Sequence, residues 1–333
     1  MAQITRRYVH IDESDRSLSL REDPVPRPGA GELLIEVHAA ALNRADLLQR
    51  KGLYPPPPDA SPIMGLEVSG AVLACGEGSR GWSPGDAVCA LTHGGGYASH
   101  AIAPHSQCLP VPAAYSLSEA AGLPEAALTV WHNLFQRAAL QPGERVLIHG
   151  GASGIGSLAV AICRAWGAEV YSTAGSDAKC RKIEALGATR AFNYREQDFV
   201  AGLEALGNKE RINVILDMVG GDYLQRNIEV AAPEARIVNI AYLRGFRAEV
   251  NFLPVLLKRL TLSASTLRAQ SASQKARMVE EITAQLFEHF DAGTVKPVID
   301  REFGLAEAAQ AHAYMQRGEH FGKILLQIGR AHV

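Results

Sequence analysis

His149-Gly150-Gly151-Ala152-Ser153-Gly154-Ile155-Gly156 follows the apolar run Val146-Leu147-Ile148 and precedes a second apolar run, Leu158–Ile162. A short buried strand, a glycine-rich turn and a helix in this order predict a phosphate-binding element. Glycines let the backbone approach a pyrophosphate closely, and the first turn of the helix offers free N–H groups and the positive end of the helix dipole. The same spacing also occurs in ordinary tight turns, so its meaning depends on the sequence around it.

The next strand, predicted over Glu169–Thr173, indicates which dinucleotide the loop binds. In NAD-binding proteins an acidic residue about 20 positions beyond the loop bonds the ribose hydroxyls and repels a 2′-phosphate. Here the strand ends in Gly175-Ser176, and Lys179 and Arg181 follow. Small residues and a lysine favour NADPH; the alternative is that both cations lie on a solvated helix face. We read Asp177 as the N-cap of the next helix.

Composition and charge are those of an ordinary two-domain enzyme. The chain has 333 residues, of which 47% are hydrophobic, enough for a core in each domain. A formal net charge of −2 leaves no basic surface for nucleic acid or an anionic membrane, and no apolar run spans a bilayer. Five dispersed cysteines, and a stretch Met1–Arg7 without the apolar core of a signal peptide, favour a cytoplasmic protein.

Two patterns divide the chain. From about Glu144 to Ser265, predicted strands and helices alternate, as in a doubly wound parallel sheet. The preceding part has short β runs separated by Gly, Pro and Asp turns, which favours a mainly antiparallel β domain. The fold class is therefore α/β, and the nucleotide-binding domain is either inserted in the second domain or appended to it. We expect a substrate cleft between the two.

The predicted strands are Leu33–Ala40, Val68–Cys75, Ala87–Leu91, Tyr97–Ile102, Arg145–His149, Glu169–Thr173, Ala191–Tyr194, Ile212–Met218, Arg236–Ala241, Leu260–Ser265, Val298–Asp300 and Lys323–Ile328. The predicted helices are Ile155–Trp166, Ala178–Leu186, Asp198–Leu206, Tyr223–Val230, Gln274–Phe290 and Leu305–Met315.

Short motifs that cover nearly the full length carry a resemblance. They include Asn43-Arg44-Ala45-Asp46-Leu47, Gly52-Leu53-Tyr54 with Pro55–Pro58, Gly65–Gly70, Gly81–Asp86, Gly94–Ala98, Leu123-Pro124-Glu125, the glycine loop, Thr173–Ser176, Phe192-Asn193-Tyr194, Asp217–Gly221 and Phe321–Ile324. Together they resemble the zinc-free quinone oxidoreductases (zeta-crystallin-like) of the medium-chain dehydrogenase/reductase superfamily, above all the tumour-suppressor-induced quinone oxidoreductase subgroup. The resemblance implies a GroES-like catalytic β domain formed from both chain ends (residues 1–125 and 266–329), a Rossmann domain between them (residues 126–265), and NADPH-dependent reduction.

Zinc ligands of the superfamily's alcohol dehydrogenases are missing. Those enzymes use a Cys, a His and a further Cys or Asp, but Asn43 stands at the first position and Gly-His-Glu appears as Gly65-Leu66-Glu67. A structural zinc needs four N or S ligands near one another, and the sequence has no compact four-cysteine lobe. We therefore expect no metal, and we interpret the neighbouring histidines as loop and strand residues: His93, His100 and His105.

The resemblance also implies site residues. Asn43 would donate its amide to the anion that forms on the acceptor, and Tyr54 would contact the acceptor or supply a proton. The alternatives are that Asn43 caps its turn, that Tyr54 packs its proline-rich loop and that Tyr194 is a core aromatic. The implied cofactor-binding residues are Thr129, Ala152, Ser153, Gly154, Ile155, Gly156, Gly175, Ser176, Lys179, Tyr194, Ile240, Tyr242, Thr266, Leu267, Arg268 and Lys323.

The sequence is consistent with three functions. The first is NADPH-dependent reduction of a small quinone by hydride transfer, without zinc. The second is NADPH-dependent reduction of an enoyl thioester or another enone, because Asn43, Asp46 and Tyr54 also fit the register of that branch, with Tyr54 as proton donor. The third is a non-catalytic NADPH-binding protein of the crystallin kind. The resemblance further implies a homodimer or homotetramer, with Leu260–Ser265 as a candidate edge strand.

Overall fold

The structure is a computed structural model that describes residues 5–329. The described residues form two compact units: unit 1 contains those up to Ala126 and those from Gln270 onward, and unit 2 contains Ala127–Ala269. Residues 1–4, which carry part of the expectation about the N-terminus, lie outside the described residues. Within 5–329, no helix has the length and apolar character needed to cross a membrane.

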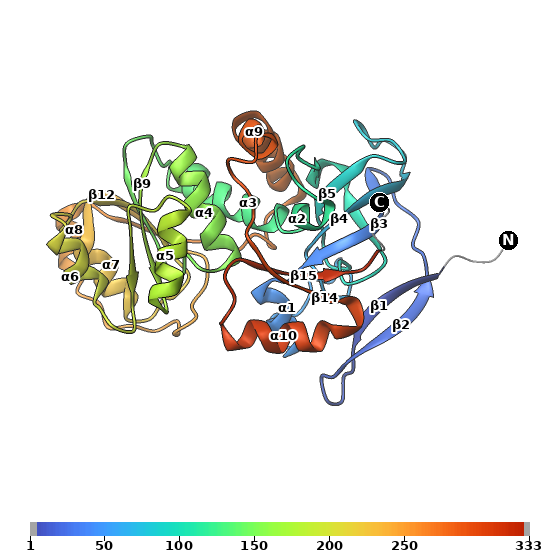
Figure 1. Cartoon of the computed structure of the whole chain (residues 1–333), viewed down its shortest axis with the longest axis horizontal. Helices are drawn as coiled ribbons and strands as arrows, with labels where there is room; N and C mark the ends of the chain where they lie inside the picture. Colours follow the sequence, from blue (N-terminus) through green and yellow to red (C-terminus); the bar gives the residue numbers. More distant parts are fainter. Residues whose placement is uncertain (1–4, 330–333) are drawn as a thin grey trace. The chain divides into compact units, whose positions relative to one another are not determined.

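Unit 2 is built around a parallel sheet of six strands in the order β10-β9-β8-β11-β12-β13 (Figure 1). These strands are β8 (Arg145–Ile148), β9 (Glu169–Ala174), β10 (Arg190–Asn193), β11 (Ile212–Asp217), β12 (Ala231–Asn239) and β13 (Thr261–Ala264). The helices are α3 (Pro124–Val130), which begins in unit 1 and continues into a π-helical segment (Trp131–Arg137), α4 (Gly154–Ala165), α5 (Asp177–Ala185), α6 (Phe199–Ala205), α7 (Tyr223–Val230) and α8 (Leu253–Lys258). The strand order reverses beside β8, which confirms the predicted doubly wound topology.

The glycine loop has its conformation for local reasons. Val146, Leu147 and Ile148 are fully buried, as expected for a central parallel strand that is covered on both faces. Helix α4 begins after Ser153 because the Ser153 hydroxyl accepts a hydrogen bond from the backbone N–H of Gly156. Gly150, between strand and helix, has a φ of +70°, which side-chain-bearing residues rarely adopt.

Unit 1 contains a mainly antiparallel sheet of seven strands, in which β14-β15-β3-β4-β5-β7 are neighbours and β6 also pairs with β3 (Figure 1). These strands are β3 (Glu32–Ala41), β4 (Glu67–Cys75), β5 (Ala87–Leu91), β6 (His100–Pro104), β7 (Cys108–Pro110), β14 (Ile299–Gly304) and β15 (Lys323–Gln327). The hairpin of β1 (Thr5–Ile11) and β2 (Leu18–Pro24) and helices α1 (Arg44–Arg50), α2 (Leu117–Ala120), α9 (Ala272–Asp291) and α10 (Ala308–Arg317) complete the unit. Because β15 pairs with β3, both ends of the described chain build one sheet.

Most predicted elements are present with ends shifted by a few residues, and β14 extends to Gly304, four residues beyond its predicted end. Three further elements differ from the prediction. Strand β12 begins at Ala231, five residues before its predicted start, because the bulge around Glu234 (φ +63°) interrupts the pattern of alternation. Strand β6 begins at His100, since Ala98 instead forms an isolated bridge with Tyr8. The helix predicted over Leu305–Met315 starts as a 3-10 turn and becomes α-helical only in α10.

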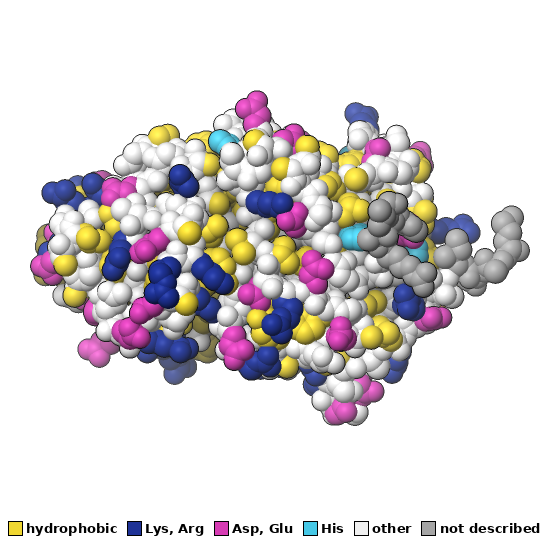
Figure 2. All heavy atoms as spheres, in the orientation of Figure 1, with side chains coloured by type: hydrophobic (Ala, Val, Ile, Leu, Met, Phe, Trp, Pro, Cys, Tyr) yellow, Lys and Arg dark blue, Asp and Glu magenta, His cyan; other side chains and the backbone are white. Residues whose placement is uncertain are grey.

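The visible surface agrees with the small net charge. On the face drawn in Figure 2, basic and acidic side chains alternate, and no large area carries a single charge. This face therefore offers no extended basic surface of the kind that binds nucleic acid.

Candidate functional site

The glycine loop lies at the carboxyl edge of the parallel sheet of unit 2. Its strand, β8, has β9 and β11 as neighbours, and doubly wound sheets bind their ligands where the strand order reverses in this way. Ser153, Gly154 and Ile155 are half-buried, so the first turn of α4 is accessible to an anion. A Cβ at Gly156 would lie 2.3 Å from the carbonyl oxygen of Gly150. Only glycine therefore lets the helix approach the loop this closely.

The end of β9 differs from the predicted arrangement in one respect. Ser176, rather than Asp177, is the N-cap of α5, and its hydroxyl accepts a hydrogen bond from the backbone N–H of Lys179. Asp177 is the first residue of the helix and accepts a hydrogen bond of 2.9 Å from the side chain of Asn193. Serine and aspartate are both good N-caps, so the sequence leaves the choice to the path of the chain after β9.

Tyr194 and Arg195 lie against the backbone of Gly175. A Cβ at Gly175 would be 2.6 Å from the Tyr194 hydroxyl oxygen and 3.6 Å from Nε of Arg195. Tyr194 is 47% exposed and is therefore not a core aromatic. Sequence reasoning missed Arg195, although its position directly after Tyr194 at the end of β10 was the available signal. A phenol hydroxyl, a guanidinium and the first turn of α5 thus lie at neighbouring strand ends, and groups of this kind bind phosphate.

A chain of buried hydrogen bonds fixes the start of the glycine loop. Burial lowers the pKa of His149, so the imidazole is neutral. Because Nδ2 of Asn227 donates to Asp217 (3.1 Å), Oδ1 of Asn227 accepts from Nε2 of His149 (2.7 Å). Nδ1 of His149 then accepts from the Thr173 hydroxyl (3.1 Å), and that hydroxyl accepts from the backbone N–H of Gly150 (3.3 Å). This series of hydrogen bonds links Gly150 to the ends of β8, β9 and β11 and to α7, and it thereby fixes the orientation of Gly150.

Asp217 anchors this chain. Its carboxylate accepts hydrogen bonds from the backbone N–H groups of Val219 (2.6 Å) and Gly220 (3.1 Å), and from the side chains of Asn227 and Asn239 (3.0 Å). These four donors satisfy a carboxyl group that is fully buried. The motif that begins at Asp217 therefore has a structural explanation: it holds the ends of β11 and β12 in place.

The other implied cofactor residues of unit 2 are found in three places. Ile240 directly follows β12 and donates its N–H to the carbonyl of Asp217 (2.8 Å), and Tyr242 is 48% exposed. Thr266, Leu267 and Arg268 follow β13, where Thr266 is exposed and Leu267 is buried. Thr129 is buried in α3.

Lys323 lies elsewhere, in a buried ionic network of unit 1. The Lys323 and Glu67 side chains form an ion pair and are 3% and 0% exposed. Asn43 joins both: its Nδ2 donates to Glu67 (2.9 Å), and its Oδ1 accepts from Nζ of Lys323 (2.8 Å). The second hydrogen of the Asn43 amide faces the carbonyl of Ala41 at 3.4 Å. Both ends of this amide are therefore engaged within unit 1.

Two further carboxyl groups lie beside this network. Asp46 forms a capping box with Asn43 and accepts a hydrogen bond from the Tyr97 hydroxyl (3.1 Å), and burial raises its pKa to about 6. The backbone N–H of Glu125 donates to Glu67 (2.8 Å), but within residues 5–329 the Glu125 carboxyl group has no hydrogen-bond partner. Burial, together with the charge of Glu67, raises the pKa of Glu125 to about 8. Sequence reasoning missed Glu67, Asp46 and Glu125 as one cluster.

Tyr54 and Leu66 are the remaining site positions of unit 1. Tyr54 is half-buried in the loop that follows α1. Leu66, at the position where zinc enzymes carry histidine, is 3% exposed and belongs to the core. In the part of the chain that the structure describes, no group of three or more His, Cys, Asp or Glu side chains could hold a metal ion.

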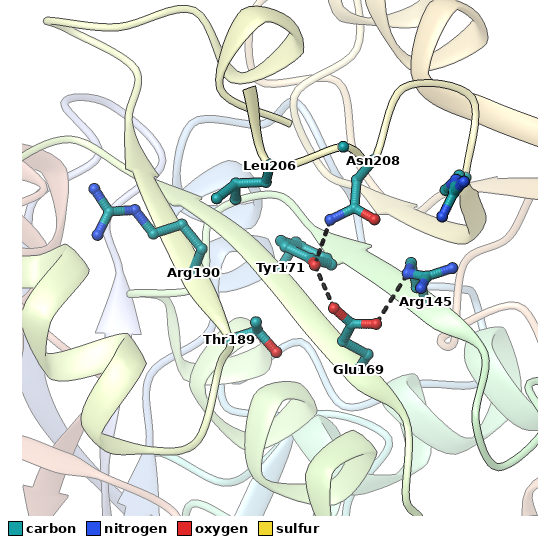
Figure 3. A pocket seen from close by; sticks show the side chains of 9 residues that line it. Arg145, Glu169, Tyr171, Thr189, Arg190, Leu206 and Asn208 are labelled. Carbon is teal, nitrogen blue, oxygen red and sulfur yellow. Dashed lines mark hydrogen bonds and ion pairs between the residues drawn. The ribbon is translucent and has the colours of Figure 1, made fainter. Parts of the chain in front are cut away.

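A separate hollow of about 600 Å³ lies at the opposite, amino edge of the sheet of unit 2 (Figure 3). Two of its three arginines have carboxylate partners: Arg145 pairs with Glu169 at 2.9 Å, and Arg190 pairs with Glu184 at 3.5 Å. The Tyr171 hydroxyl donates to Glu169, as the dashed lines of Figure 3 show. Because its charges are mostly balanced and it faces away from the glycine loop, we do not assign the dinucleotide to this hollow.

Known proteins match both units. Residues 29–113 match the family described as alcohol dehydrogenase GroES-like domain, and residues 186–326 match the family described as zinc-binding dehydrogenase. A phenolphthiocerol/phthiocerol polyketide synthase component of Mycobacterium tuberculosis is 32% identical over 96% of the chain, which spans only 15% of that protein's length. The quinone oxidoreductase of Mus musculus is 31% identical, and the match covers 93% of each protein.

Solved structures share the fold. The Escherichia coli quinone oxidoreductase, solved with NADPH, is 27% identical with a TM-score of 0.84, and the match covers 97% of this chain and 100% of that one. The CurK enoyl reductase is 29% identical with a TM-score of 0.84, over 97% and 99% of the two chains. These matches confirm the predicted pairing of a Rossmann-like unit with a GroES-like unit, and the chain belongs to the medium-chain dehydrogenase/reductase superfamily.

Proposed function

We propose that the chain is an NADPH-dependent oxidoreductase that reduces quinones by hydride transfer without zinc. One observation carries the proposal: Ser176 and Tyr194, just after β9 and β10, and Lys179, in the first turn of α5, stand in the region where an NAD-binding protein would place an acid. The likeness to the mouse quinone oxidoreductase, and to the E. coli enzyme solved with NADPH, supports it. Asn43 and Leu66 at the zinc-ligand positions support the zinc-free chemistry.

The dinucleotide would bind along the carboxyl edge of unit 2 and supplies the hydride when bound. The loop from Ala152 to Gly156 would hold the pyrophosphate. Ser176, Lys179 and Tyr194, now joined by Arg195, would hold the 2′-phosphate. The residues proposed for the nicotinamide end are Thr129, Ile240, Tyr242, Thr266, Leu267 and Arg268. We assign Lys323 to the ion pair with Glu67 rather than to the cofactor.

Asn43 receives a different role from the one that the resemblance implied. Because both ends of its amide are engaged, we propose that it is a positioning residue rather than a donor to the acceptor. It holds the start of α1 through the capping box with Asp46, and α1 leads into the loop of Tyr54. Tyr54 remains the residue proposed to contact the acceptor.

Reduction of enoyl thioesters is the second candidate. It is favoured by the match to a polyketide synthase and by the likeness to the CurK enoyl reductase. Tyr54 would then be the proton donor. Activity on a crotonyl thioester that is lost in Tyr54→Phe would favour this candidate over quinone reduction.

The test of the first proposal is a panel of acceptors assayed with NADPH. We expect oxidation of NADPH with benzoquinones and naphthoquinones and little with the crotonyl thioester. A protein that reduces none of the quinones would overturn the proposal. Tight NADPH binding without turnover of any quinone, enone or thioester would instead favour the non-catalytic, crystallin-like protein.

We also propose a homodimer formed through unit 2. Strand β13 ends the sheet, and on its far side no described strand pairs with it. Nearby on α8, Leu253, Leu256 and Leu257 are 58%, 73% and 66% exposed. An unpaired edge strand beside exposed leucines is expected to be covered by a second copy. Light scattering after chromatography should give twice the chain mass for the wild type and the single chain mass for Leu256→Asp. The cytoplasmic location stays a prediction.

A further inference from the structure

We propose that Glu125 is the proton donor of the reaction, which protonates the acceptor oxygen that becomes anionic when hydride arrives. The inference rests on the proposed function and adds a catalytic residue to it. The motif Leu123-Pro124-Glu125 contributes to the resemblance to the quinone oxidoreductases, but that resemblance implied no role for the Glu125 side chain.

The surroundings of Glu125 favour a carboxyl group that keeps its proton. The side chain is half-buried and accepts no hydrogen bond within residues 5–329. The charges that act on it are those of Glu67 of β4, Asp46 of α1, Lys323 of β15 and Lys275 of α9. Lys323 and Glu67 are paired with each other, so their charges largely offset one another at Glu125. A partly buried carboxyl group that has no cation of its own is most stable when protonated, because burial disfavours the charged form.

These surroundings shift the pKa of Glu125 upward, as expected for a buried carboxyl group. Burial, followed by the charge of Glu67, raises the pKa of Glu125 to about 8, although Lys323 acts in the opposite direction. A carboxylic acid that holds its proton near neutral pH is a suitable general acid, because its pKa is close to the working pH.

Helix α3 places this acid near the proposed site of hydride transfer. Glu125 and Thr129 are four residues apart in α3 and therefore lie on the same face, one helical turn from each other. Thr129 is the residue proposed to face the nicotinamide. A proton donor and the hydride donor would thus approach the same acceptor.

The step balances in atoms and electrons. The hydride brings two electrons to the quinone, and one quinone oxygen takes up the negative charge. The O–H bond of the Glu125 carboxyl group breaks, and its proton goes to that oxygen, which gives the hydroquinone. The Glu125 carboxylate then regains a proton from solvent, so each turnover consumes one NADPH and one proton.

The first test compares quinones whose hydroquinones differ in acidity. Glu125→Gln preserves the size of the side chain but cannot donate a carboxylic proton. With quinones that form weakly acidic hydroquinones, we expect kcat to fall about 100-fold. With quinones whose hydroquinones leave as anions at the assay pH, the fall in kcat should be small.

The pH dependence of the rate gives a further comparison. The wild-type rate should decline above about pH 8, where Glu125 loses its proton, and Glu125→Gln should lack that decline. Glu77→Gln, an exposed glutamate of the same unit, is the control.

The second test does not depend on activity. The pKa of Glu125 is raised to about 8 in the folded protein, from an ordinary value of 4.5. The folded state therefore holds a proton that the unfolded state releases, and this group makes the protein less stable as pH rises from 4.5 to 8. The unfolding midpoint of Glu125→Gln, relative to wild type, should rise steadily through that window, whereas that of Glu77→Gln should not.

Each outcome decides the matter. An equal effect of Glu125→Gln on all quinones, or a relative unfolding midpoint that does not change with pH, overturns the donor role of Glu125 while wild-type quinone reduction stands. A wild-type protein that reduces no quinone overturns the proposed function, and the donor role with it.

Discussion

Each unit buries a polar network beneath the residues proposed for the reaction, but the two networks are built in opposite ways. In unit 1, Lys323 and Glu67 form a buried ion pair that the Asn43 amide bridges. In unit 2, neutral side chains pass hydrogen bonds from Gly150 through His149 to one carboxylate, Asp217. The first network depends on balanced charge, and the second depends on the direction of each donor.

The difference shows what each network can do. A buried ion pair adds little net stability, but loss of one partner leaves an uncompensated charge. A neutral chain costs less to bury, and it fixes orientation because every donor has one acceptor. We infer that unit 1 holds charged groups at fixed positions near Glu125, whereas unit 2 holds a loop in shape for a phosphate.

The largest expected effect comes from breaking the ion pair. Lys323→Met leaves Glu67 buried without a cation and should destabilise the protein by about 3–5 kcal/mol. Denaturant unfolding measures the loss. The double variant Lys323→Met, Glu67→Leu removes both charges and should recover part of it. A loss in the single variant below about 1 kcal/mol, the value of an exposed pair, would show that the ionic description of unit 1 is wrong.

Breaking the neutral hydrogen-bond network of unit 2 should cost less stability than breaking the ion pair of unit 1. Asn227→Leu leaves the N–H of His149 without an acceptor and removes one donor from Asp217, which should destabilise the protein by about 2–3 kcal/mol. Because Gly150 is then less well held, KM for NADPH should rise more than kcat falls. Glu229→Ala, an exposed change on the same helix, should stay within about 0.5 kcal/mol. An unchanged KM for NADPH in Asn227→Leu would mean that this hydrogen-bond network does not position the glycine loop.

The networks should also respond to pH in opposite directions. His149 has a lowered pKa in the folded protein, so the unfolded state binds more protons and stability falls as pH drops below about 6.5. Glu125, with its raised pKa, acts at higher pH and in the other direction. His149→Gln should flatten the acid side of a stability profile and leave the Glu125 effect in place. The same acid slope in His149→Gln and wild type would contradict this assignment.

The smallest effect concerns the residue that the sequence analysis missed at the end of β10. Arg195 is exposed, so Arg195→Ala should change stability by less than about 0.5 kcal/mol. If its guanidinium contacts the 2′-phosphate, KM for NADPH should rise about fivefold, as expected for an exposed charge pair of about 1 kcal/mol. KM for NADH is the internal control. An equal rise for both dinucleotides would remove Arg195 from the phosphate site.

Much of unit 2 could be predicted because its signals are local. The apolar run of β8, the glycines and the N-cap of α4 lie within a few residues of one another. The networks could not be predicted, because their members meet only in three dimensions: Lys323 and Glu67 are 256 residues apart, and His149 and Asn227 are 78 apart. Asn43 is the clearest example, because the motif Asn43–Leu47 identified this residue but gave no information about Glu67 and Lys323, which bind its amide.

We propose that the carboxyl edge of unit 2 selects NADPH by its 2′-phosphate. The most direct measurement is kcat/KM for NADPH and for NADH with one quinone, in wild type and in Lys179→Ala. We expect wild type to prefer NADPH by at least about tenfold, which corresponds to about 1.4 kcal/mol, and Lys179→Ala to lose most of that preference. A wild type that uses both dinucleotides equally, or a variant that weakens both to the same extent, would contradict the claim.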